Sequence, residues 1–459
     1  MTSIVARLRE VLGADAVLDA AAAAGRARHA WDPSPLEALA LVRPRTTGEV
    51  SAVLRLCNSA GQPVVTHGGV TGLCGGARAT ARDVVLSLER MNRIEEIDPV
   101  GRTAILQAGC VLQKVQDAIA KEGLLFPLDL GARGSCTVGG NVATNAGGSN
   151  VIRYGMMRAL VLGLEVVLAD GTVISSMNRM LKNNTGYDLK QLFIGSEGTL
   201  GVVTRMVVAL QEAPASTSTA LAALDSIEKV ALLLRHMNRE LGGRMSSFEV
   251  MWGDFYRAVT EPGWNKAPLD RDHPVYVIVE SEGPDPVRDA ESFEAAVAAA
   301  FGQDLLVDAV IAKSGIERDE LWAIREDLGP IRANQPLFAY DVSLPIRDMP
   351  GYVRQVQARV SERWPEGRCY TFGHMGDGNL HFVICPGEPG DDLHARVDAA
   401  VYEPLAPLGG AVSAEHGIGL DKRAWLPLSR SDAEIGLMRL LKQTLDPRNI
   451  LNPGKVVPP

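Results

Sequence analysis

The sequence predicts an α+β protein of more than one domain, and three observations support this fold class. The chain has 459 residues, which is too long for one ordinary domain. Short apolar runs alternate with helical periodicity along both halves of the chain. Many of the 46 glycines gather in two clusters, at 68–76 and 131–148. We therefore expect strands and helices joined by glycine-rich loops.

The first half has the pattern of an α+β domain that ends near residue 213. Helical spacing covers 50–60, and strand-like runs occupy 62–66, 84–88, 103–107, 164–168 and 201–210. A polar stretch at 214–219, Pro-Ala-Ser-Thr-Ser-Thr, is predicted to be a linker. The first domain is accordingly predicted over residues 1–213.

The second half predicts another α+β domain, over residues 214–412. Helices are expected near 225–240 and 286–301, and strands at 275–280, 305–309 and 339–344. The remaining segment, 413–459, contains an amphipathic helix at 432–445. We treat it as a separate C-terminal helical segment.

Composition excludes several classes of partner. The net charge is −9 and the sequence pI is about 5.5, with no block of Lys or Arg, so no nucleic acid partner is expected. No run of about eighteen uncharged apolar residues predicts a membrane span, and the first residues lack the charge order of a signal peptide. Six scattered cysteines without a Cys-x-x-Cys pair indicate a reducing compartment, and we expect a cytoplasmic protein.

The two glycine clusters predict a dinucleotide site. The first follows a predicted strand, where backbone N–H groups can face a diphosphate if no side chain intervenes. One cluster alone is equally compatible with tight turns in a surface loop. A third glycine-rich segment at 195–203 favours the dinucleotide interpretation. Neither a Rossmann fingerprint nor a P-loop is present, so the cofactor must be held in another way.

Two histidines and a glutamate form a candidate metal site. Apolar runs at 369–372 and 382–385 are predicted to be strands joined by a tight Gly-Asp-Gly turn, which would bring His374 and His381 together. Glu415 would complete a ligand set of two nitrogens and one oxygen, which suits zinc or a similar divalent ion and leaves a position for substrate. The alternative is that both histidines are ordinary hairpin residues and that Gly376 and Gly378 serve only the turn.

These motifs resemble a known family over nearly the whole chain, from about residue 44 to 455. The first half resembles the FAD-binding domain of the vanillyl-alcohol oxidase and p-cresol methylhydroxylase (PCMH) superfamily. The second half resembles the FAD-linked oxidase C-terminal domain of D-lactate, glycolate and D-2-hydroxyglutarate dehydrogenases. The resemblance implies a two-part PCMH-type FAD domain, an α+β substrate and metal domain, and a C-terminal segment that completes the active site.

The resemblance assigns the glycine-rich segments to FAD. Residues 67–73 would wrap the diphosphate, 134–148 would line the flavin and ribityl chain, and 197–203 would contact the adenine side. The implied cofactor residues are His67, Gly68, Gly69, Val70, Thr71, Gly72, Leu73, Gly134, Ser135, Thr137, Gly139, Gly140, Asn141, Thr144, Asn145, Gly148, Glu197, Gly198, Gly201, Val202, Val203 and Asn452. Relatives that attach FAD covalently through the first loop have a histidine where this chain has Val70, so noncovalent FAD is expected.

The resemblance also implies roles in catalysis. His374, His381 and Glu415 would hold a divalent metal, for which zinc is expected, and His416 would be the catalytic base. A metal-bound hydroxyl loses its proton more readily, and the hydride at C2 of a 2-hydroxy acid can then pass to flavin N5. An alternative for His416 is that it only orients Glu415. Arg325 matches the arginine that clamps the substrate carboxylate, and the alternative is a solvated helix arginine paired with Glu326 or Asp327.

Three substrate positions depart from the 2-hydroxyglutarate pattern. The relatives that take 2-hydroxyglutarate resemble this chain but have a threonine, a lysine and an asparagine at three positions. This chain has Gly329, Ala339 and Val383 at those positions. Loss of three polar groups favours a D-lactate-like monocarboxylate over D-2-hydroxyglutarate. Arg332 and Arg347 could restore dicarboxylate binding from another direction.

The leading hypothesis is an FAD- and metal-dependent D-2-hydroxy acid dehydrogenase with a small-molecule substrate. The alternatives are a D-2-hydroxyglutarate dehydrogenase, a metal-free flavin oxidase of alcohols or phenols, and a non-catalytic flavoprotein that carries electrons. The sequence does not name the electron acceptor, which could be a quinone, an electron-transferring flavoprotein or a cytochrome. It also leaves open whether the protein is a homodimer.

Overall fold

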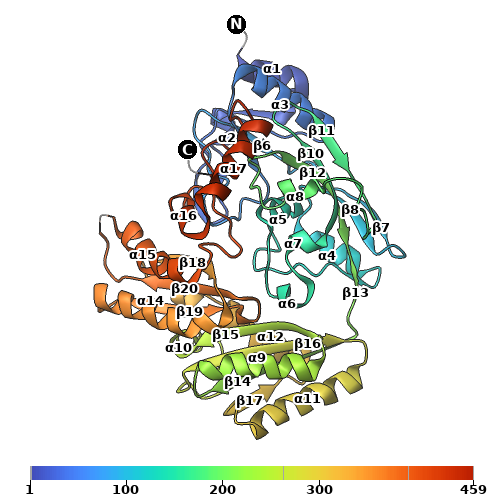
Figure 1. The fold of residues 1–459 in the computed structure, drawn as a ribbon. Helices are drawn as coiled ribbons and strands as arrows, with labels where there is room; N and C mark the ends of the chain where they lie inside the picture. The colour runs from blue at the N-terminus through green and yellow to red at the C-terminus, as the bar shows by residue number, and fades with distance from the viewer. Residues whose placement is uncertain (1–2, 262, 391, 458–459) are drawn as a thin grey trace. The chain divides into compact units, whose positions relative to one another are not determined.

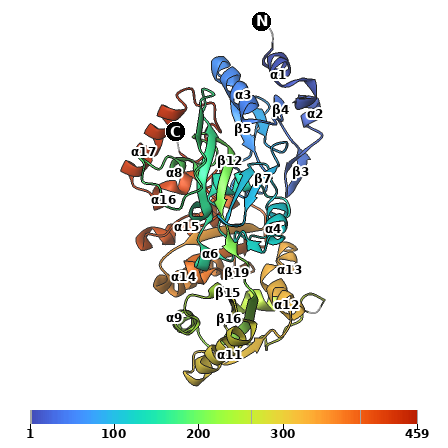
Figure 2. The same cartoon turned by 90° about the vertical axis from the view of Figure 1, so that its right-hand side faces the viewer.

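The computed structural model describes residues 3–457 except 262 and 391, and the chain forms two compact units. Unit 1 consists of Met1–Gly148, Gly155–Ala213 and Glu415–Pro459, and unit 2 consists of Ser149–Tyr154 and Pro214–Ala414. Figures 1 and 2 show the elements of both units from two directions. Each unit contains helices packed on antiparallel or mixed sheets, which confirms the predicted α+β class.

Unit 1 has two main sheets. The first has the order β1-β4-β6-β5, with β4, β6 and β5 parallel, and the second is the antiparallel sheet β11-β10-β12-β8-β7. Their strands are β1 (Val17–Asp19), β4 (Ala40–Val42), β5 (Val64–His67), β6 (Val84–Ser87), β7 (Ile94–Asp98), β8 (Thr103–Gln107), β10 (Val161–Val167), β11 (Val173–Ser176) and β12 (Val202–Ala209). Strands β6 and β8 are buried along their whole length, as expected for central strands covered on both faces.

Short helices and hairpins complete unit 1. They are α1 (Ile4–Leu12), α2 (Ala20–Ala23), α3 (Thr47–Ala60), α4 (Leu112–Ala120), α5 (Val138–Thr144), α7 (Met157–Leu160), α8 (Lys190–Phe193), α16 (Leu426–Ser429) and α17 (Asp432–Leu445), with the short strands β2 (Ala27–His29), β3 (Asp32–Pro35), β9 (Leu124–Leu125) and β13 (Gln211–Glu212). The C-terminal segment returns to the first sheet, because Val64 bridges Leu451 at the edge of β5. This pairing anchors the end of the chain beside the loop that follows β5.

Unit 2 is built on one seven-stranded antiparallel sheet with the order β17-β14-β16-β15-β19-β20-β18. Its strands are β14 (Ser216–Leu224), β15 (Met245–Trp252), β16 (Val275–Gly283), β17 (Asp308–Ile311), β18 (Phe338–Ser343), β19 (Arg368–Gly373) and β20 (Asn379–Cys385). Its helices are α6 (Val151–Tyr154), α9 (Glu228–Leu241), α10 (Gly253–Val259), α11 (Pro286–Gly302), α12 (Gly315–Glu326), α13 (Gly329–Arg332), α14 (Met349–Arg363) and α15 (Leu393–Tyr402). Helices α9 and α11 lie side by side over β14, β15 and β16 (Figures 1 and 2).

Helices α10, α12 and α13 contribute to the apolar core on one face of this sheet. Phe255 of α10, Trp322 of α12 and Ile331 of α13 pack with Phe372 of β19 and Val383 of β20 in one buried cluster. Burying this apolar surface is the main favourable contribution to folding of the unit. The same face carries the side chains of the candidate site.

Most predicted elements are present, but the predicted linker at 214–219 is wrong from residue 216 onward. Strand β14 begins at Ser216 and pairs with β16, with Thr217 opposite Glu282 and Thr219 opposite Glu280. The buried Thr219 hydroxyl donates to the Glu280 carboxylate at 2.6 Å, so the polar residues are satisfied inside the sheet. Cross-strand pairing therefore outweighs the loop-like composition. The strand predicted at 305–309 also begins later, at Asp308.

Candidate active site

A cavity in unit 1 gathers the glycine-rich segments. It is lined by the loop after β5, the start of α5, the residues between α8 and β12, and two residues of the C-terminal segment. Glycine is required at several walls because the chain segments touch. A Cβ on Gly69 would lie 2.2 Å from the carbonyl oxygen of Ser135, and one on Gly139 would lie 2.6 Å from the Ala108 Cβ. The missing side chains thus allow the segments that form the cavity walls to pack closely against one another.

The cavity brings together most of the predicted cofactor residues. Those that line it are Gly68, Gly69, Val70, Thr71, Gly72, Thr137, Gly139, Gly140, Asn141, Thr144, Glu197, Gly198, Gly201, Val202, Val203 and Asn452. The lining formed by the described residues does not include His67, Leu73, Gly134, Ser135, Asn145 or Gly148. Sequence reasoning missed Thr66, Cys74, Gly76, Ala77, Leu88 and Ser196, and it gave His416 a different role. Thr66, Cys74 and Ser196 are immediate neighbours of predicted residues.

His67 contributes to the loop rather than to the cavity wall. Its Nε2 atom lies 2.7 Å from the carbonyl oxygen of Ala77, and the side chain is buried. Burial lowers the pKa of His67 to about 4, so the imidazole is neutral at pH 7. A neutral ring that donates to Ala77 ties the two ends of the glycine-rich loop together.

Two buried polar groups indicate that the cavity fits a polar cofactor. Among the described residues, Thr66 Oγ1 and Lys455 Nζ are buried without a hydrogen-bond partner. Thr66 lines the cavity, and the Lys455 ammonium interacts with the charge of Glu197, which also lines it. Burial lowers the pKa of Lys455 to about 8. Buried polar groups of this kind normally have a partner, and the oxygens of a flavin dinucleotide would supply one.

Asn452 and Glu197 join three walls of the cavity. The Asn452 side chain accepts from the Thr66 amide at 3.0 Å and donates to the Glu197 carbonyl at 2.6 Å. The Glu197 carboxylate accepts from the backbone amides of Ile418 and Gly419, at 2.7 and 2.9 Å. Burial raises the pKa of Glu197, and these two amides act against that effect. Its predicted role on the adenine side stays a prediction.

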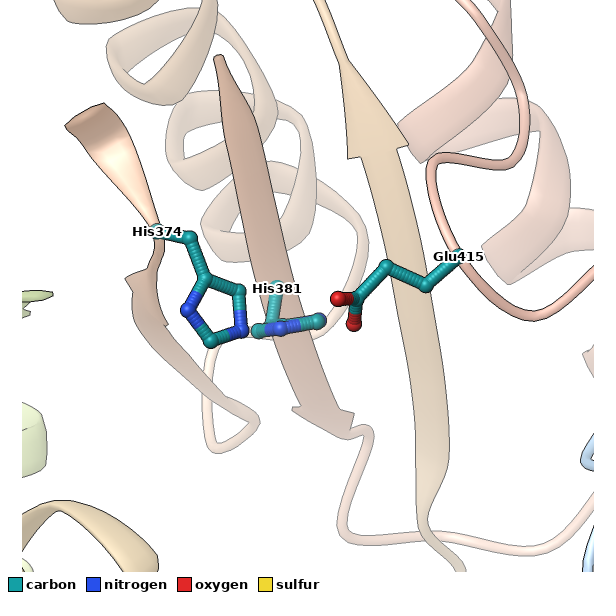
Figure 3. A group of neighbouring side chains, drawn as sticks. All are labelled: His374, His381 and Glu415. Carbon is teal, nitrogen blue, oxygen red and sulfur yellow. The ribbon is translucent and has the colours of Figure 1, made fainter. Parts of the chain in front are cut away.

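His374, His381 and Glu415 lie together as the ligand pattern predicted. Each offers one ligand atom, and the three atoms lie within 4.8 Å of one another. Their side chains point toward one another in Figure 3. The two imidazole rings are nearly perpendicular, with centroids 5.2 Å apart. Two nitrogens and one carboxylate oxygen at this spacing fit a divalent ion of the zinc type after small side-chain adjustments.

Strands β19 and β20 position both histidines. The predicted hairpin strands are present, and they are joined by a single 3₁₀ turn, Met375–Asp377, followed by Gly378 with φ +92°. A Cβ on Gly376 would lie 2.7 Å from the side chain of Ile152 in α6, so this glycine is fixed by packing as well as by the turn.

Glu249 of β15, which sequence reasoning missed, supports the first ligand. Its carboxylate lies 2.6 Å from His374 Nδ1 and also accepts from Arg325 Nε at 3.0 Å. Burial acts to raise the pKa of Glu249, but the charges of His374 and Arg325 outweigh it and hold the pKa below its ordinary value. The contact at Nδ1 directs a metal toward Nε2 of His374. No local sequence signal marks Glu249, since it lies 125 residues before its partner.

Arg325, the predicted carboxylate clamp, is already engaged by Glu249. Its Nε and Nη2 atoms both lie 3.0 Å from Glu249, and its guanidinium stacks over the Phe372 ring at 4.7 Å. The side chain is buried on the same sheet face as His381. Glu249 therefore uses Nε and one proton of Nη2, and a substrate carboxylate would have to bind the outer edge of the guanidinium, through Nη1 and the second proton of Nη2.

Asp341 of β18 supports the third ligand. Its carboxylate accepts from Asn379 Nδ2 at 2.9 Å, and from Ser413 Oγ and the Ala414 amide, both at 3.1 Å. Asp341 is opposite His381 in the β18–β20 register. The fully buried Asp341 carboxylate fixes the backbone immediately before Glu415. It therefore helps to position the Glu415 side chain without being a metal ligand itself.

The comparisons with known proteins identify the family. Residues 38–176 match a family described as FAD binding domain, and residues 213–456 match FAD linked oxidases, C-terminal domain. The chain is 40% identical to a D-2-hydroxyglutarate dehydrogenase from Xanthomonas citri pv. viticola, over 93% of this chain and 90% of the relative. It is 39% identical to a mitochondrial D-2-hydroxyglutarate dehydrogenase from Bos taurus, over 91% of this chain and 76% of the relative.

A solved structure agrees at the level of the fold. Substrate-bound p-cresol methylhydroxylase superposes with a TM-score of 0.74 at 17% identity, covering 99% of this chain and 96% of that chain. The chain belongs to the FAD-linked oxidases with a PCMH-type FAD-binding domain, and the predicted family and two-part architecture are confirmed. The protein is an FAD-dependent oxidoreductase. Among the described residues, no helix is long and apolar enough to cross a membrane.

Proposed function

We propose that this protein is an FAD- and divalent-metal-dependent dehydrogenase that oxidises a D-2-hydroxy acid to the 2-oxo acid. The observation that carries the proposal is the cluster of His374, His381 and Glu415, whose ligand atoms lie within 4.8 Å of one another. When bound, a divalent ion would lower the pKa of the substrate hydroxyl and FAD would accept the hydride. A flavin oxidase that works without metal has no use for these three ligands.

The protein side chains supply orientation and proton transfer. Arg325 would bind the substrate carboxylate through Nη1 and the second proton of Nη2 while Glu249 holds the other side of the guanidinium. His416 would take the hydroxyl proton. It directly follows the ligand Glu415 in the chain and lines the cofactor cavity. Histidine suits this role because its charge changes near neutral pH.

The residues at the three diverging positions support a monocarboxylic substrate. Ala339 and Val383 are cross-strand partners in β18 and β20, and Val383 is buried in the apolar cluster that includes Phe372. A Cβ on Gly329 would lie 2.9 Å from Oδ1 of Asp327 and 3.1 Å from the ring of Trp264, so this position also offers no partner for a second carboxylate. An apolar surface of this kind penalises an unpaired second carboxylate through desolvation. We therefore propose that D-lactate-like acids are preferred to D-2-hydroxyglutarate.

A D-2-hydroxyglutarate dehydrogenase is the second candidate, favoured by the names of the relatives. A protein of Schizosaccharomyces pombe at 37% identity, over 91% of this chain and 81% of that relative, is instead named as a putative mitochondrial D-lactate dehydrogenase. The names therefore include both substrates. The cytoplasmic location inferred from the cysteines stays a prediction.

Anaerobic stopped-flow measurements of flavin bleaching, combined with metal analysis of the same sample, test the proposal. D-lactate and D-2-hydroxybutyrate should exceed D-2-hydroxyglutarate and D-malate in kcat/KM, and L-enantiomers should be inactive. A clear preference for D-2-hydroxyglutarate would overturn the substrate proposal but not the class of reaction. Bleaching at full rate in metal-free protein would overturn the metal role.

Paired variants identify the source of the preference. The double variant Ala339→Lys and Val383→Asn should raise activity on D-2-hydroxyglutarate, because it restores polar groups at two positions. Arg347→Ala tests the alternative binder of the second carboxylate, since Arg347 is an exposed residue whose ion pair is with its neighbour Asp348. If Arg347→Ala abolishes dicarboxylate oxidation, the second carboxylate is bound by that arginine instead.

Noncovalent FAD is part of the proposal, because Val70 offers no nucleophile for a flavin bond. Acid precipitation should release intact yellow FAD into the supernatant. Flavin that stays with the precipitated chain would contradict this expectation.

A further inference from the structure

The loop that carries His416 is held by hydrogen bonds to one buried carboxylate, that of Glu197, which is more than 200 residues earlier in the chain. Residues 416–419 have the sequence His-Gly-Ile-Gly, and the amides of Ile418 and Gly419 donate to Oε1 and Oε2 of Glu197 at 2.7 and 2.9 Å. Glu197 itself lines the cofactor cavity and is 7% exposed. Both oxygens of a single carboxylate are thus used to hold two successive amides of the loop.

The two glycines of this loop are explained by close contacts with Glu197 and with the backbone of Cys74. Gly417 has φ +81°, and a Cβ there would lie 2.7 Å from Glu197 Oε1. Gly419 has φ +52°, and a Cβ there would lie 2.0 Å from the carbonyl oxygen of Cys74. That carbonyl also accepts from the Leu420 amide at 2.9 Å, and the Cys74 thiol donates to the His416 carbonyl at 2.9 Å. The loop therefore lies against two walls of the cavity without side chains between them.

We infer that Glu197 is a positioning residue that fixes the 416–419 loop, and with it His416, against the cofactor cavity. This inference rests on the proposed function for the role of His416, whereas the holding of the loop by Glu197 does not. Glu197 also has φ +52°, a conformation that side-chain-bearing residues rarely adopt. A charged acceptor that satisfies two buried amides at once is stronger than a neutral one, and its loss leaves at least one amide without an acceptor.

Glu197→Gln is the sharpest variant because it keeps the size of the side chain. The amide group of glutamine offers one oxygen, so its NH₂ would face one of the two backbone donors. Hydrogen–deuterium exchange of the FAD-loaded protein should be about tenfold or more faster in a peptide that covers 416–422. The rate constant of flavin reduction should fall about 10- to 100-fold, with the substrate Kd changing by less than about threefold, because His416 is misplaced rather than removed.

Gly417→Ala tests the contact between the loop and Glu197 by changing the loop. It also provides the test if the Glu197→Gln variant does not fold. The added methyl group should displace the loop from the carboxylate and accelerate exchange in the same peptide. Gly61→Ala is its matched control, since Gly61 has φ +64° but no atom within 4 Å of the added Cβ. Glu165→Gln controls for loss of a buried carboxylate in unit 1, because Glu165 binds Thr47, Thr204 and Arg205 but not the loop.

Exchange that is faster in both test variants and unchanged in both controls would establish the positioning role. Wild-type exchange in the 416–422 peptide of folded, FAD-loaded Glu197→Gln or Gly417→Ala protein would overturn it, as would an equal acceleration in Glu165→Gln. If no D-2-hydroxy acid bleaches the flavin of the wild-type protein, the proposed function fails. The exchange measurement still decides whether Glu197 holds the loop.

Discussion

The cofactor cavity of unit 1 is formed largely by glycines and backbone, whereas the candidate metal ligands are side chains supported by buried carboxylates of unit 2. In unit 1, Gly69 and Gly139 are needed because other chain segments occupy the space of a Cβ. In unit 2, Glu249 contacts His374 and Asp341 fixes the backbone before Glu415. The cavity should therefore be most sensitive to substitutions that add atoms, and the ligand cluster to substitutions that remove them.

The largest expected effect is the loss of a metal ligand in variants that keep their flavin. His374→Ala, His381→Ala or Glu415→Ala should abolish turnover and metal content, because each removes one of three protein ligands. FAD content should stay at the wild-type level, since the described cavity lining does not include any of these three residues. Metal analysis and the flavin spectrum of each variant provide the measurement. A metal-free His381→Ala protein with full activity would contradict the role of the cluster.

Removing the proposed base should have the next largest effect. His416→Ala should slow flavin reduction about 10²- to 10⁴-fold, the usual contribution of a general base. The variant should keep its metal, because the ligand cluster consists of His374, His381 and Glu415. Stopped-flow reduction and metal analysis of the same preparation separate the two effects. If the metal is lost together with the activity, His416 supports the ligands instead of acting as the base.

Glu249→Gln should weaken metal binding without removing a ligand. Glutamine has one side-chain oxygen and cannot serve His374 and Arg325 as the carboxylate does, so metal affinity should fall about 10- to 100-fold. Titration of metal into the metal-stripped, FAD-loaded protein measures this change. Glu280→Gln is the control, because Glu280 is a buried carboxylate of the same sheet that binds Arg318 and Trp322 instead. Equal affinities for Glu249→Gln and the wild type would show that Glu249 is structural only.

The smallest expected effect concerns the loop of unit 1. His67 is buried in its neutral form with a pKa of about 4, below the ordinary histidine value, so its contribution to stability is present above about pH 6.5 and is lost as pH falls toward 4. Between pH 7 and pH 5 the wild type should lose about 2 kcal/mol of unfolding free energy from this group. His67→Gln, which can still donate to Ala77, should lack that part of the loss. Denaturant unfolding of both proteins at the two pH values measures the difference, and equal losses would exclude His67 as the source.

With FAD named by the family resemblance, the sequence by itself determined the α+β class, several of the helices and strands, and a dinucleotide site in unit 1. It could do so because periodicity and glycine clustering are local signals, and a wall made of backbone requires glycines that are close together in the chain. The ligand trio was also readable, since His374 and His381 are separated by one turn and Glu415 is adjacent to His416. The polar composition of residues 214–219 gave a wrong prediction of a linker. Residues 216–219 are part of strand β14, because they pair with β16.

Only the tertiary structure decided which side chains support the site. Glu249, Arg325 and His374 meet because β15, α12 and the turn after β19 pack on one sheet face, although 125 residues separate the first from the last. Glu197 reaches amides that lie 221 and 222 residues further along the chain. A buried carboxylate has no local sequence pattern of its own, because its partners are set by sheet register and by loop packing rather than by neighbouring residues.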